Sequence, residues 1–204
     1  MSGTAYILAS KNKNKAKEIK EILGDDYEVI TQTEAGIGDI DVIEDGETFE
    51  ENAAKKAETI MKATGKPTIA DDSGLCVDLL DGAPGIYSAR YMGEDTPYSI
   101  KNAELIRRLE GVPDEKRTAR FVCAIAMCRP DGSCETVRAT MEGIIAYEPA
   151  GENGFGYDPI FYLPEYGCTS SELSPEDKNA ISHRGKALEM IKDILMDECC
   201  KVVG

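Results

Sequence analysis

The stretch TAYILASKNKNKAKEIKEILGDDYEVIT, residues 4–31, reads as a strand, a helix and a second strand. Residues 4–9 are an apolar run of the length typical of a buried strand, and residues 27–31 form another. Between them, apolar side chains recur at helical spacing, which predicts a helix over residues 12–23 that ends at Gly24. A strand–helix–strand unit at the start of a chain indicates an α/β fold.

The rest of the chain alternates between predicted helices and strands. Thr48 and Glu51 have capping-box spacing for a helix, and the apolar residues 67–70 predict a strand. Residues 120–148 carry two apolar-rich stretches around Pro-Asp-Gly, which is the pattern of a hairpin and therefore predicts a mixed sheet. Further helices are predicted over residues 97–110 and from about residue 182 onward. No repeat or linker divides the chain, so residues 1–204 are expected to form a single domain.

Charge is distributed unevenly along this acidic chain. It has 38 acidic and 23 basic side chains and a formal net charge of -15, which opposes binding to nucleic acid or to an anionic membrane. Yet residues 9–18 contain four lysines, at positions 11, 13, 15 and 17. A small anionic ligand would need such a local cluster of positive charge, or a metal ion.

Cysteine usage favours a reducing compartment. The seven cysteines include no Cys-x-x-Cys pair, and the apolar run near the N-terminus is too short for a secretory signal or a membrane span. We therefore expect a cytoplasmic chain whose cysteines are reduced and act as small core residues. The chain has one histidine, and this argues against a zinc site.

The lysine-rich segment combines with a polar turn. On a helix, Lys17 lies opposite the apolar face, whereas Lys15 projects over the packed face on the first turn. Ser10, Asn12 and Asn14 occupy the strand-to-helix turn, where backbone N–H groups and the helix dipole favour an anion. The pattern predicts a phosphate cradle, and a solvated helix face is the alternative.

Two adjacent aspartates, Asp71 and Asp72, follow an apolar strand and precede Ser-Gly. Hard oxygen ligands at a strand end suit Mg²⁺, whose shell phosphate oxygens can complete. The alternative is that both aspartates begin a turn and cap local N–H groups. Glu44, Asp45 and Glu47, in the preceding acidic loop, are candidate second ligands, unless that loop is merely exposed.

A glycine-rich segment, GENGFGYDPIFY, spans residues 151–162. Gly154 and Gly156 would let the backbone approach a ligand closely, and Phe155 offers a flat face for a base. Alternatively, Phe155 and Tyr157 fill the core.

The segment SHRGKAL places the only histidine, His183, beside Arg184 at a predicted helix start. A histidine at such a position is usually a cap or a surface residue. Beside a guanidinium with five N–H donors, it could instead bind a carbonyl group on a base.

Taken together and in this order, these segments resemble the inosine/xanthosine triphosphate pyrophosphatase family. The matching motifs are Ser10, Asn12, Lys15 and Glu18 in a Thr/Ser-x-Asn-x-x-Lys-x-x-Glu pattern, DDSGL…GAPGIYSARY at 71–91, GFGYDPIF at 154–161 and SHRG at 182–185. TFEENAAKKA at 48–57 matches the segment between the first two motifs. The resemblance runs from about residue 5 to residue 195.

The resemblance implies an elongated mixed β-sheet flanked by helices, with two lobes around a central substrate cleft, usually in a homodimer. It also implies Mg²⁺-dependent hydrolysis of dITP, ITP and XTP to the monophosphate and pyrophosphate, by attack of water on the α-phosphorus. Such an enzyme removes non-standard purines from the nucleotide pool. The alternatives are a pyrophosphatase of pyrimidine or other modified nucleotides, a phosphatase releasing single phosphates, and a nucleotide sensor without turnover.

Residue roles follow from the same resemblance. Asp72 would be a metal ligand and the base, Glu44 the second metal ligand, and Lys15 would neutralise charge on the pyrophosphate. The triphosphate loop would comprise Ser10, Lys11, Asn12, Lys13, Asn14 and Lys15. Nucleotide contacts would come from Lys56, Ser73, Phe155, Gly156, Tyr157, Asp158, Lys178, His183 and Arg184, with the base at the His183–Arg184 end.

Overall fold

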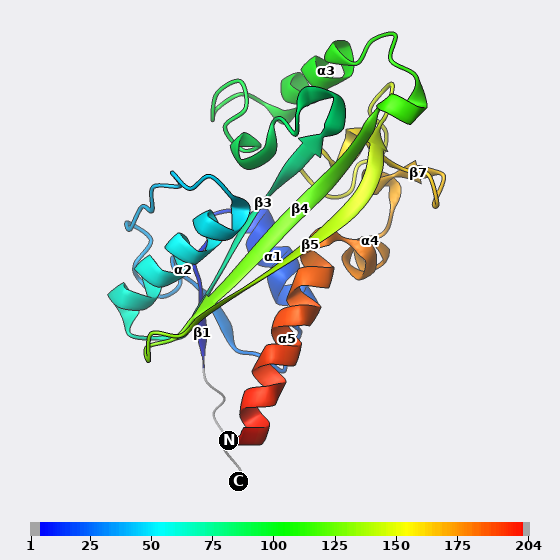
Figure 1. Ribbon diagram of the computed structural model, residues 1–204. Helices are drawn as coiled ribbons and strands as arrows, with labels where there is room; N and C mark the ends of the chain where they lie inside the picture. Colours follow the sequence, from blue (N-terminus) through cyan, green and yellow to red (C-terminus); the bar gives the residue numbers. More distant parts are fainter. Residues whose placement is uncertain (1–4, 202–204) are drawn as a thin grey trace. The chain divides into compact units, whose positions relative to one another are not determined.

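The computed structural model describes residues 5–201, and within them seven strands form one sheet in the order β2-β1-β3-β4-β5-β6-β7 (Figure 1). The strands are β1 (Tyr6–Leu8), β2 (Val29–Thr31), β3 (Thr68–Val77), β4 (Thr118–Cys128), β5 (Cys134–Ile145), β6 (Phe161–Leu163) and β7 (Cys168–Thr169). The α-helices are α1 (Lys13–Leu23), α2 (Phe49–Thr64), α3 (Tyr98–Arg108), α4 (Pro175–Ile181) and α5 (His183–Lys201). β1 pairs in parallel with β2 and β3, whereas β6 pairs antiparallel with β5 and β7, which confirms the predicted mixed sheet.

The opening strand–helix–strand unit forms as predicted. Asn12 caps α1 by accepting hydrogen bonds from the first helical turn, and Gly24 ends the helix at a φ of 70°. β1 and β2 then pair in register from Tyr6 opposite Val29 to Leu8 opposite Thr31. A parallel pair needs a crossover of this kind, and the amphipathic α1 supplies it.

Strand β3 is longer than the sequence indicated. The apolar run at 67–70 predicted a strand that ends before Asp71, but β3 continues to Val77 and includes both aspartates. The alternative that Asp71 and Asp72 begin a turn is therefore wrong. Aspartate is depleted in strands, so contacts with residues distant in the sequence must hold two consecutive aspartates in β3.

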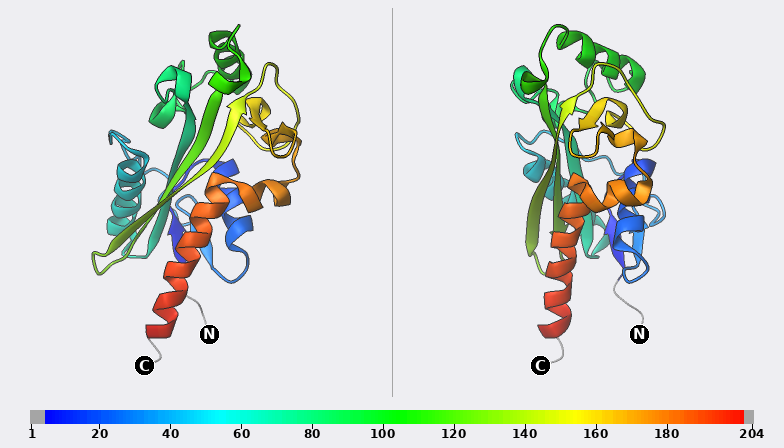
Figure 2. Two further views of the ribbon diagram at one scale, coloured as in Figure 1. Left: turned by 45° about the vertical axis from the view of Figure 1, so that its right-hand side comes forward. Right: turned by 90° about the vertical axis from the view of Figure 1, so that its right-hand side faces the viewer.

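The chain divides into two compact units. Within the described residues, unit 1 comprises residues 5–72, 123–139 and 184–201, and unit 2 comprises residues 73–122 and 140–183. In unit 1, alternate residues of β4 such as Cys123 and Ile125 pack with α1 and α5. Cys128 has the opposite parity in the strand, and its Sγ lies 4.0 Å from the backbone oxygen of Ala54 in α2. Consistent with this alternation, α2 lies on the opposite side of these strands from α1 and α5 (Figure 2).

Unit 2 has an apolar core of its own. Phe121 and Phe161 pack with ring centroids 4.5 Å apart, and Leu105 and Leu109 of α3 are fully buried in the same cluster. A short helix, α4, lies in this unit and was not predicted, because its seven residues are too few for a clear apolar period.

The expectation of reduced cysteines is wrong for one pair. Cys128 and Cys134 form a disulfide across the β4–β5 hairpin, because the turn places two facing strand positions at a Cα–Cα distance of 4.1 Å. Cys123 is a fully buried core residue, as predicted. Cys199 and Cys200 lie outside the residues whose side chains the structure describes.

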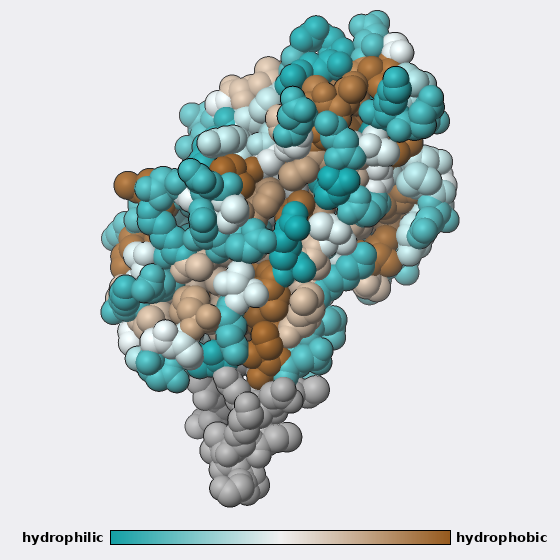
Figure 3. Space-filling view, viewed as in Figure 1, coloured by the Kyte–Doolittle hydropathy of each residue, from teal (hydrophilic) through white to brown (hydrophobic). Residues whose placement is uncertain are grey.

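Hydrophilic residues predominate on the face shown in Figure 3, where hydrophobic residues form small groups. None of the described helices combines the length and the apolar character needed to cross a membrane.

Candidate active site

The turn before α1 differs in one respect from the predicted phosphate cradle. Asn12 Oδ1 accepts hydrogen bonds from the backbone N–H groups of Asn14 (3.0 Å) and Lys15 (3.2 Å), and Ser10 Oγ accepts from Asn12 N (3.3 Å). Three backbone N–H groups of this turn, those of Asn12, Asn14 and Lys15, therefore already have acceptors within it. The positive charge of this segment consequently lies in its lysine side chains.

The lysines of this segment divide as the helical pattern predicted. Lys15 is half-buried, and its Nζ lies 3.1 Å from Asp71 Oδ2. Lys17 is exposed and faces Glu21 at 3.7 Å. Lys11 Nζ lies 2.5 Å from Oδ1 of the exposed Asp41. Lys13 and Asn14 are exposed on the first helical turn. Of these residues, Lys15 is the one that the fold directs to the buried carboxylates.

Asp71 holds two cations together. Its Oδ2 accepts from Arg184 Nη2 at 3.2 Å as well as contacting Lys15, and the side chain is 1% exposed. Burial alone would raise the pKa of Asp71, but Lys15, Arg184 and Lys56 outweigh it and hold that pKa well below its ordinary value. Arg184 also donates to Glu18 Oε2 at 2.5 Å. The result is a buried network of two carboxylates and two cations.

Asp72 belongs to a second group. Its Oδ2 accepts a hydrogen bond from Asn52 Nδ2 at 3.2 Å, and its Oδ1 lies 3.7 Å from Lys56 Nζ. Lys56 Nζ in turn donates to Glu44 Oε1 at 3.1 Å. The structure thus brings together Glu44, Lys56 and Asp72, all named from the sequence. Burial raises the pKa of Asp72, and the nearby Glu44 and Asp71 act in the same direction, against Lys56 and Lys15.

The donor set around Lys56 suits a hard cation. Two carboxylates, those of Glu44 and Asp72, contact one ammonium group, and oxygen ligands of this kind are those that Mg²⁺ prefers. Among the described residues, no group of three or more His, Cys, Asp and Glu side chains is placed to hold a metal. Asp45, another candidate ligand, is exposed and forms an ion pair with Lys55 instead. A metal here would therefore need oxygen ligands from a phosphate or from water.

The glycine-rich segment of unit 2 is organised by Asp158. Its Oδ2 accepts from Lys178 Nζ (2.6 Å) and from Phe155 N (2.8 Å), and its Oδ1 accepts from Ser170 Oγ (3.1 Å). Gly154 has a φ of +74°, and a Cβ there would lie 2.2 Å from Asp158 Oδ2. Only glycine fits this position, for reasons of both backbone conformation and space.

Aromatic residues of this segment have different surroundings. Phe155 is half-buried, and Lys178 Nζ lies 5.3 Å from its ring centroid. Tyr157 is buried, donates from its hydroxyl to the Ser88 carbonyl at 2.8 Å, and packs edge-on against Tyr98. The alternative that these aromatics fill the core therefore holds for Tyr157 and not for Phe155.

His183 begins α5, as the sequence predicted, but it is not a surface residue. It is 5% exposed, and its ring stacks on Phe121 with centroids 4.9 Å apart and an interplanar angle of 11°. Ser73 is half-buried in β3, and the carbonyl oxygen of Gly156 accepts a hydrogen bond from Asn102 Nδ2 at 3.1 Å. These residues complete the predicted set.

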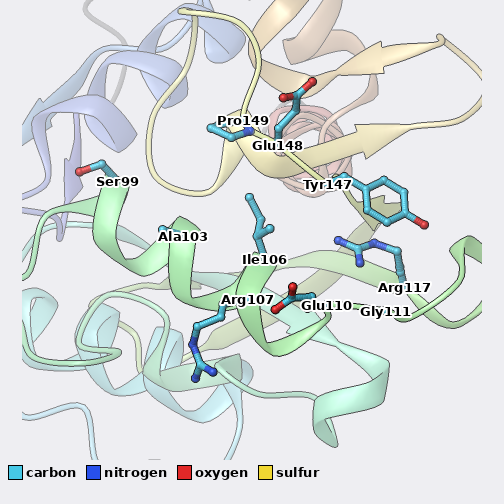
Figure 4. A pocket seen from close by; sticks show the side chains of 10 residues that line it. All are labelled: Ser99, Ala103, Ile106, Arg107, Glu110, Gly111, Arg117, Tyr147, Glu148 and Pro149. Carbon is cyan, nitrogen blue, oxygen red and sulfur yellow. The ribbon is translucent and has the colours of Figure 1, made fainter.

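A cavity of about 530 Å³ lies elsewhere in unit 2, between α3 and residues 147–149 (Figure 4). Arg117 on its wall donates to the carbonyl oxygens of Leu109, Ile145 and Ala146, which explains how a guanidinium can be fully buried there. None of the predicted site residues lines it. The remaining lining residues are Ser99, Ala103, Ile106, Arg107, Glu110, Gly111, Tyr147, Glu148 and Pro149.

Sequence reasoning gave no role to Asn52, named Glu18 only as a motif position, and considered Asp71 only as a candidate metal ligand beside Asp72, not as the partner of Lys15 and Arg184. A signal existed for Asn52, because it falls on the inward stripe of α2 between Phe49 and Ala53, where a polar side chain needs a polar partner. The partners of Glu18 and Asp71 lie far away in the sequence, so no local pattern could identify them.

Comparisons with known proteins agree with one another. The model of the Ham1 family matches residues 6–194. A dITP/XTP pyrophosphatase of Geobacter sulfurreducens is 49% identical over 192 residues, covering 94% of this chain and 96% of the relative. A dITP/XTP pyrophosphatase of Desulforamulus reducens is 51% identical over 190 residues, covering 93% and 94%. The structure of the Staphylococcus aureus Ham1 protein superposes with a TM-score of 0.86 at 45% identity, covering 95% of this chain and 99% of that one.

Proposed function

This chain belongs to the Ham1 family, and on that premise we propose that it hydrolyses non-standard purine nucleoside triphosphates to the monophosphate and pyrophosphate. The observation that carries the proposal is the identity of about half of all residues, over nearly the whole length, with relatives named dITP/XTP pyrophosphatase. We take dITP, ITP and XTP as the substrates. Removal of such nucleotides keeps the purine pool free of bases that mispair.

The proposal assigns the metal to Glu44 and Asp72. Both carboxylates contact Lys56, so this pair already forms a cation-binding arrangement. We propose Mg²⁺ as the cofactor, with the phosphates of the substrate completing its ligands. When bound, the ion supplies charge neutralisation and lowers the pKa of a water molecule.

Unit 1 supplies the groups for the triphosphate. Lys15 and Lys56 neutralise negative charge that grows on the departing pyrophosphate, and the polar turn from Ser10 through Lys11, Asn12, Lys13 and Asn14 lies beside Lys15. Asp72 accepts a proton from the attacking water.

The nucleoside is assigned to Ser73, Phe155, Gly156, Tyr157, Asp158, Lys178, His183 and Arg184. Asp158 and Lys178 fix the backbone around Phe155, whose ring would contact the base. Tyr157 acts from the core by supporting that segment. Arg184 would donate to the keto oxygen at purine position 6; a guanidinium has five N–H donors, and Glu18 and Asp71 accept from two of its nitrogens.

Selectivity against adenine follows from the chemistry of that position, whereas guanine carries the same keto oxygen, so the expected rejection of dGTP rests on the resemblance to the family. Adenine has an amino group where hypoxanthine and xanthine have a keto oxygen, so a buried donor opposite adenine loses its acceptor. A site built to hydrogen-bond one group can reject the analogue by ~10⁴–10⁵.

Product analysis tests the proposal. The protein is incubated with Mg²⁺ and dITP, XTP, dATP or dGTP, and pyrophosphate and inorganic phosphate are followed separately. We expect pyrophosphate from dITP and XTP and little turnover of dATP or dGTP. Turnover of all four would contradict base selectivity, release of single phosphates would indicate a phosphatase, and binding without turnover would indicate a sensor. Pyrimidine and other modified triphosphates complete the panel.

Two further predictions belong to this proposal, a homodimer and a cytoplasmic location. Light scattering on the peak that elutes from a size-exclusion column measures the molar mass and thereby tests for the homodimer. Fractionation of cells that express the protein measures the second.

A further inference from the structure

We propose that Asn52 is a positioning residue that holds the Glu44 loop and the Asp72 carboxylate at a fixed separation, and thereby sets the affinity for the divalent cation. The inference rests on the proposed function, because that function assigns the cation to Glu44 and Asp72. Asn52 is neither of these ligands, and it lies on α2, whereas Glu44 precedes the helix and Asp72 lies in β3.

The two ends of the Asn52 amide bind different segments of the chain. Its Nδ2 donates to Asp72 Oδ2 at 3.2 Å, and its Oδ1 accepts from Gly46 N at 2.9 Å. The side chain is fully buried. An ionised carboxylate can only accept and a backbone N–H can only donate, so one orientation of the amide satisfies both partners. Asn52 thus connects the acidic loop directly to Asp72.

A second link runs beside the first. Lys56 follows Asn52 by four residues, which places both side chains on the same face of α2. Lys56 contacts Glu44 at 3.1 Å and Asp72 at 3.7 Å, so it spans the same two segments as Asn52. The contact between Lys56 and Asp72, at 3.7 Å, is too long for a hydrogen bond and constrains the orientation of the carboxylate little. The contact between Asn52 and Asp72, at 3.2 Å, is a hydrogen bond and does constrain it.

The loop is also attached to the start of the helix. Glu51 Oε2 accepts from Glu47 N at 2.7 Å, and Thr48 Oγ1 accepts from Glu51 N at 3.1 Å. These bonds fix the loop to α2 but do not reach β3. Of the hydrogen bonds named above, the one from Asn52 Nδ2 connects α2 to Asp72 in β3. Without the Asn52 amide, the bonds of Glu51 and Thr48 should still hold the loop on α2. The carboxylates of Glu44 and Asp72 should then move apart under their mutual repulsion.

The test measures binding of Mg²⁺ alone by isothermal titration calorimetry, without nucleotide. The first variant is Asn52→Leu, which keeps the side-chain volume and removes both hydrogen bonds. The second is Gly46→Ala, whose Cβ would lie 2.8 Å from Asn52 Oδ1 and 2.9 Å from Glu51 Cβ, so the loop must shift away from Asn52. Partners that orient metal ligands are typically worth roughly 10- to 100-fold in affinity, and we expect a loss in that range for both variants.

Two matched controls separate positioning from general damage. Gly38→Ala lies in the same loop, and its Cβ would meet Thr33 Oγ1 at an ordinary 3.4 Å. Asn102→Leu removes another helical asparagine that is nearly buried, in unit 2. Neither should change the dissociation constant for Mg²⁺. If thermal melting shows that Asn52→Leu is not folded, Gly46→Ala alone tests the positioning role, because Gly46 lies in a half-exposed loop.

The outcomes are distinct from those that test the proposed function. The positioning role is supported if both variants bind Mg²⁺ more weakly and if a high Mg²⁺ concentration partly restores their hydrolysis of dITP. Unchanged Mg²⁺ affinity in Gly46→Ala and in folded Asn52→Leu overturns it, even if the wild-type protein hydrolyses dITP. A wild-type protein that hydrolyses none of the nucleotides overturns the proposed function itself, whatever the binding of Mg²⁺.

Discussion

Asp71 and Asp72 are consecutive residues of β3, yet their carboxylates belong to different networks: Asp71 binds Lys15 and Arg184, and Asp72 binds Asn52 and lies near Lys56. The cause is the two-residue period of a strand, which directs adjacent side chains to opposite faces of the sheet. One aspartate therefore meets α1 and the start of α5, and the other meets α2. A single Asp-Asp pair can serve two chemical purposes for this reason.

The first prediction concerns the Asp72 network. Asp72→Asn should lower kcat for dITP by about 10²- to 10⁴-fold, because it removes a proton acceptor and an ionised ligand while it preserves side-chain shape. Nucleotide binding should remain, since the lysines that neutralise phosphate charge are unchanged. Pyrophosphate release measures the first effect and calorimetry with dITP the second. Full turnover by the variant would remove Asp72 from the chemistry.

The second prediction concerns the Asp71 network and pH. The pKa of Asp71 is held below its ordinary value, so its ion pairs stabilise the folded state at pH values above that ordinary value, ~4, and this stabilisation is lost as the pH falls through the lower folded-state pKa. At pH 7, Asp71→Asn leaves Lys15 and Arg184 without their shared anion, and we expect a loss of about 3–5 kcal/mol in the free energy of unfolding.

Urea unfolding between pH 2 and pH 7 measures this difference. The gap between wild type and Asp71→Asn should narrow in acid. Asp41→Asn is the matched control, since Asp41 pairs with Lys11 at the exposed surface and such pairs contribute little. An equal gap at every pH would show that the ion pairs of Asp71 do not stabilise the fold.

A third prediction concerns the backbone beside Phe155. Gly154→Ala adds a Cβ at 2.2 Å from Asp158 Oδ2 and strains a φ of +74°. The Asp158 carboxylate must then leave Lys178 or Phe155 N, and the segment assigned to the nucleoside must move. We expect KM for dITP to rise about tenfold or more, while kcat changes less, because the phosphate groups are held elsewhere.

Gly167→Ala is the control for that experiment. Gly167 also has a positive φ, of +68°, but its Cβ would meet no heavy atom within 4 Å. It therefore reproduces the backbone strain without the collision. Similar values of KM in both variants would show that strain, and not the position of Asp158, causes the effect.

Local patterns in the sequence were sufficient for the opening elements and for the site residues that lie on them. Helical spacing separated Lys15 from Lys17, and the structure pairs Lys15 with a buried carboxylate and Lys17 with an exposed one. Capping spacing placed the start of α2 correctly at Thr48. These predictions succeeded because the interactions involved span only a few residues.

Features that depend on distant partners were not predictable in the same way. Glu18 meets Arg184 across 166 positions, and nothing near either residue indicates the other. The continuation of β3 through two aspartates depends likewise on cations from α1, α2 and α5. The Cys128–Cys134 disulfide was not predictable from composition, because the absence of a Cys-x-x-Cys pair indicates a reduced chain and local spacing alone does not show which cysteines pair.

The last prediction separates two roles of Arg184. Its guanidinium binds Asp71 and Glu18, so Arg184→Ala must weaken the buried network whether or not Arg184 contacts a base. A residue that serves only as a counter-ion would affect all purine triphosphates alike. A donor to the keto oxygen would affect dITP and not dATP. We therefore expect the ratio of kcat/KM for dITP to that for dATP to fall roughly 10- to 100-fold, since a hydrogen bond from a charged donor is worth about 1.5–3 kcal/mol.

Inhibition by pyrophosphate provides the internal reference for Arg184→Ala. Pyrophosphate has no base, so its inhibition constant should change far less than kcat/KM for ITP or dITP. Glu18→Gln is the matched control, because it perturbs the same network from the other side of the guanidinium and leaves Arg184 present. If Glu18→Gln and Arg184→Ala lower the turnover of dITP and dATP by the same factors, Arg184 acts through the network alone, and the base must be read by another group.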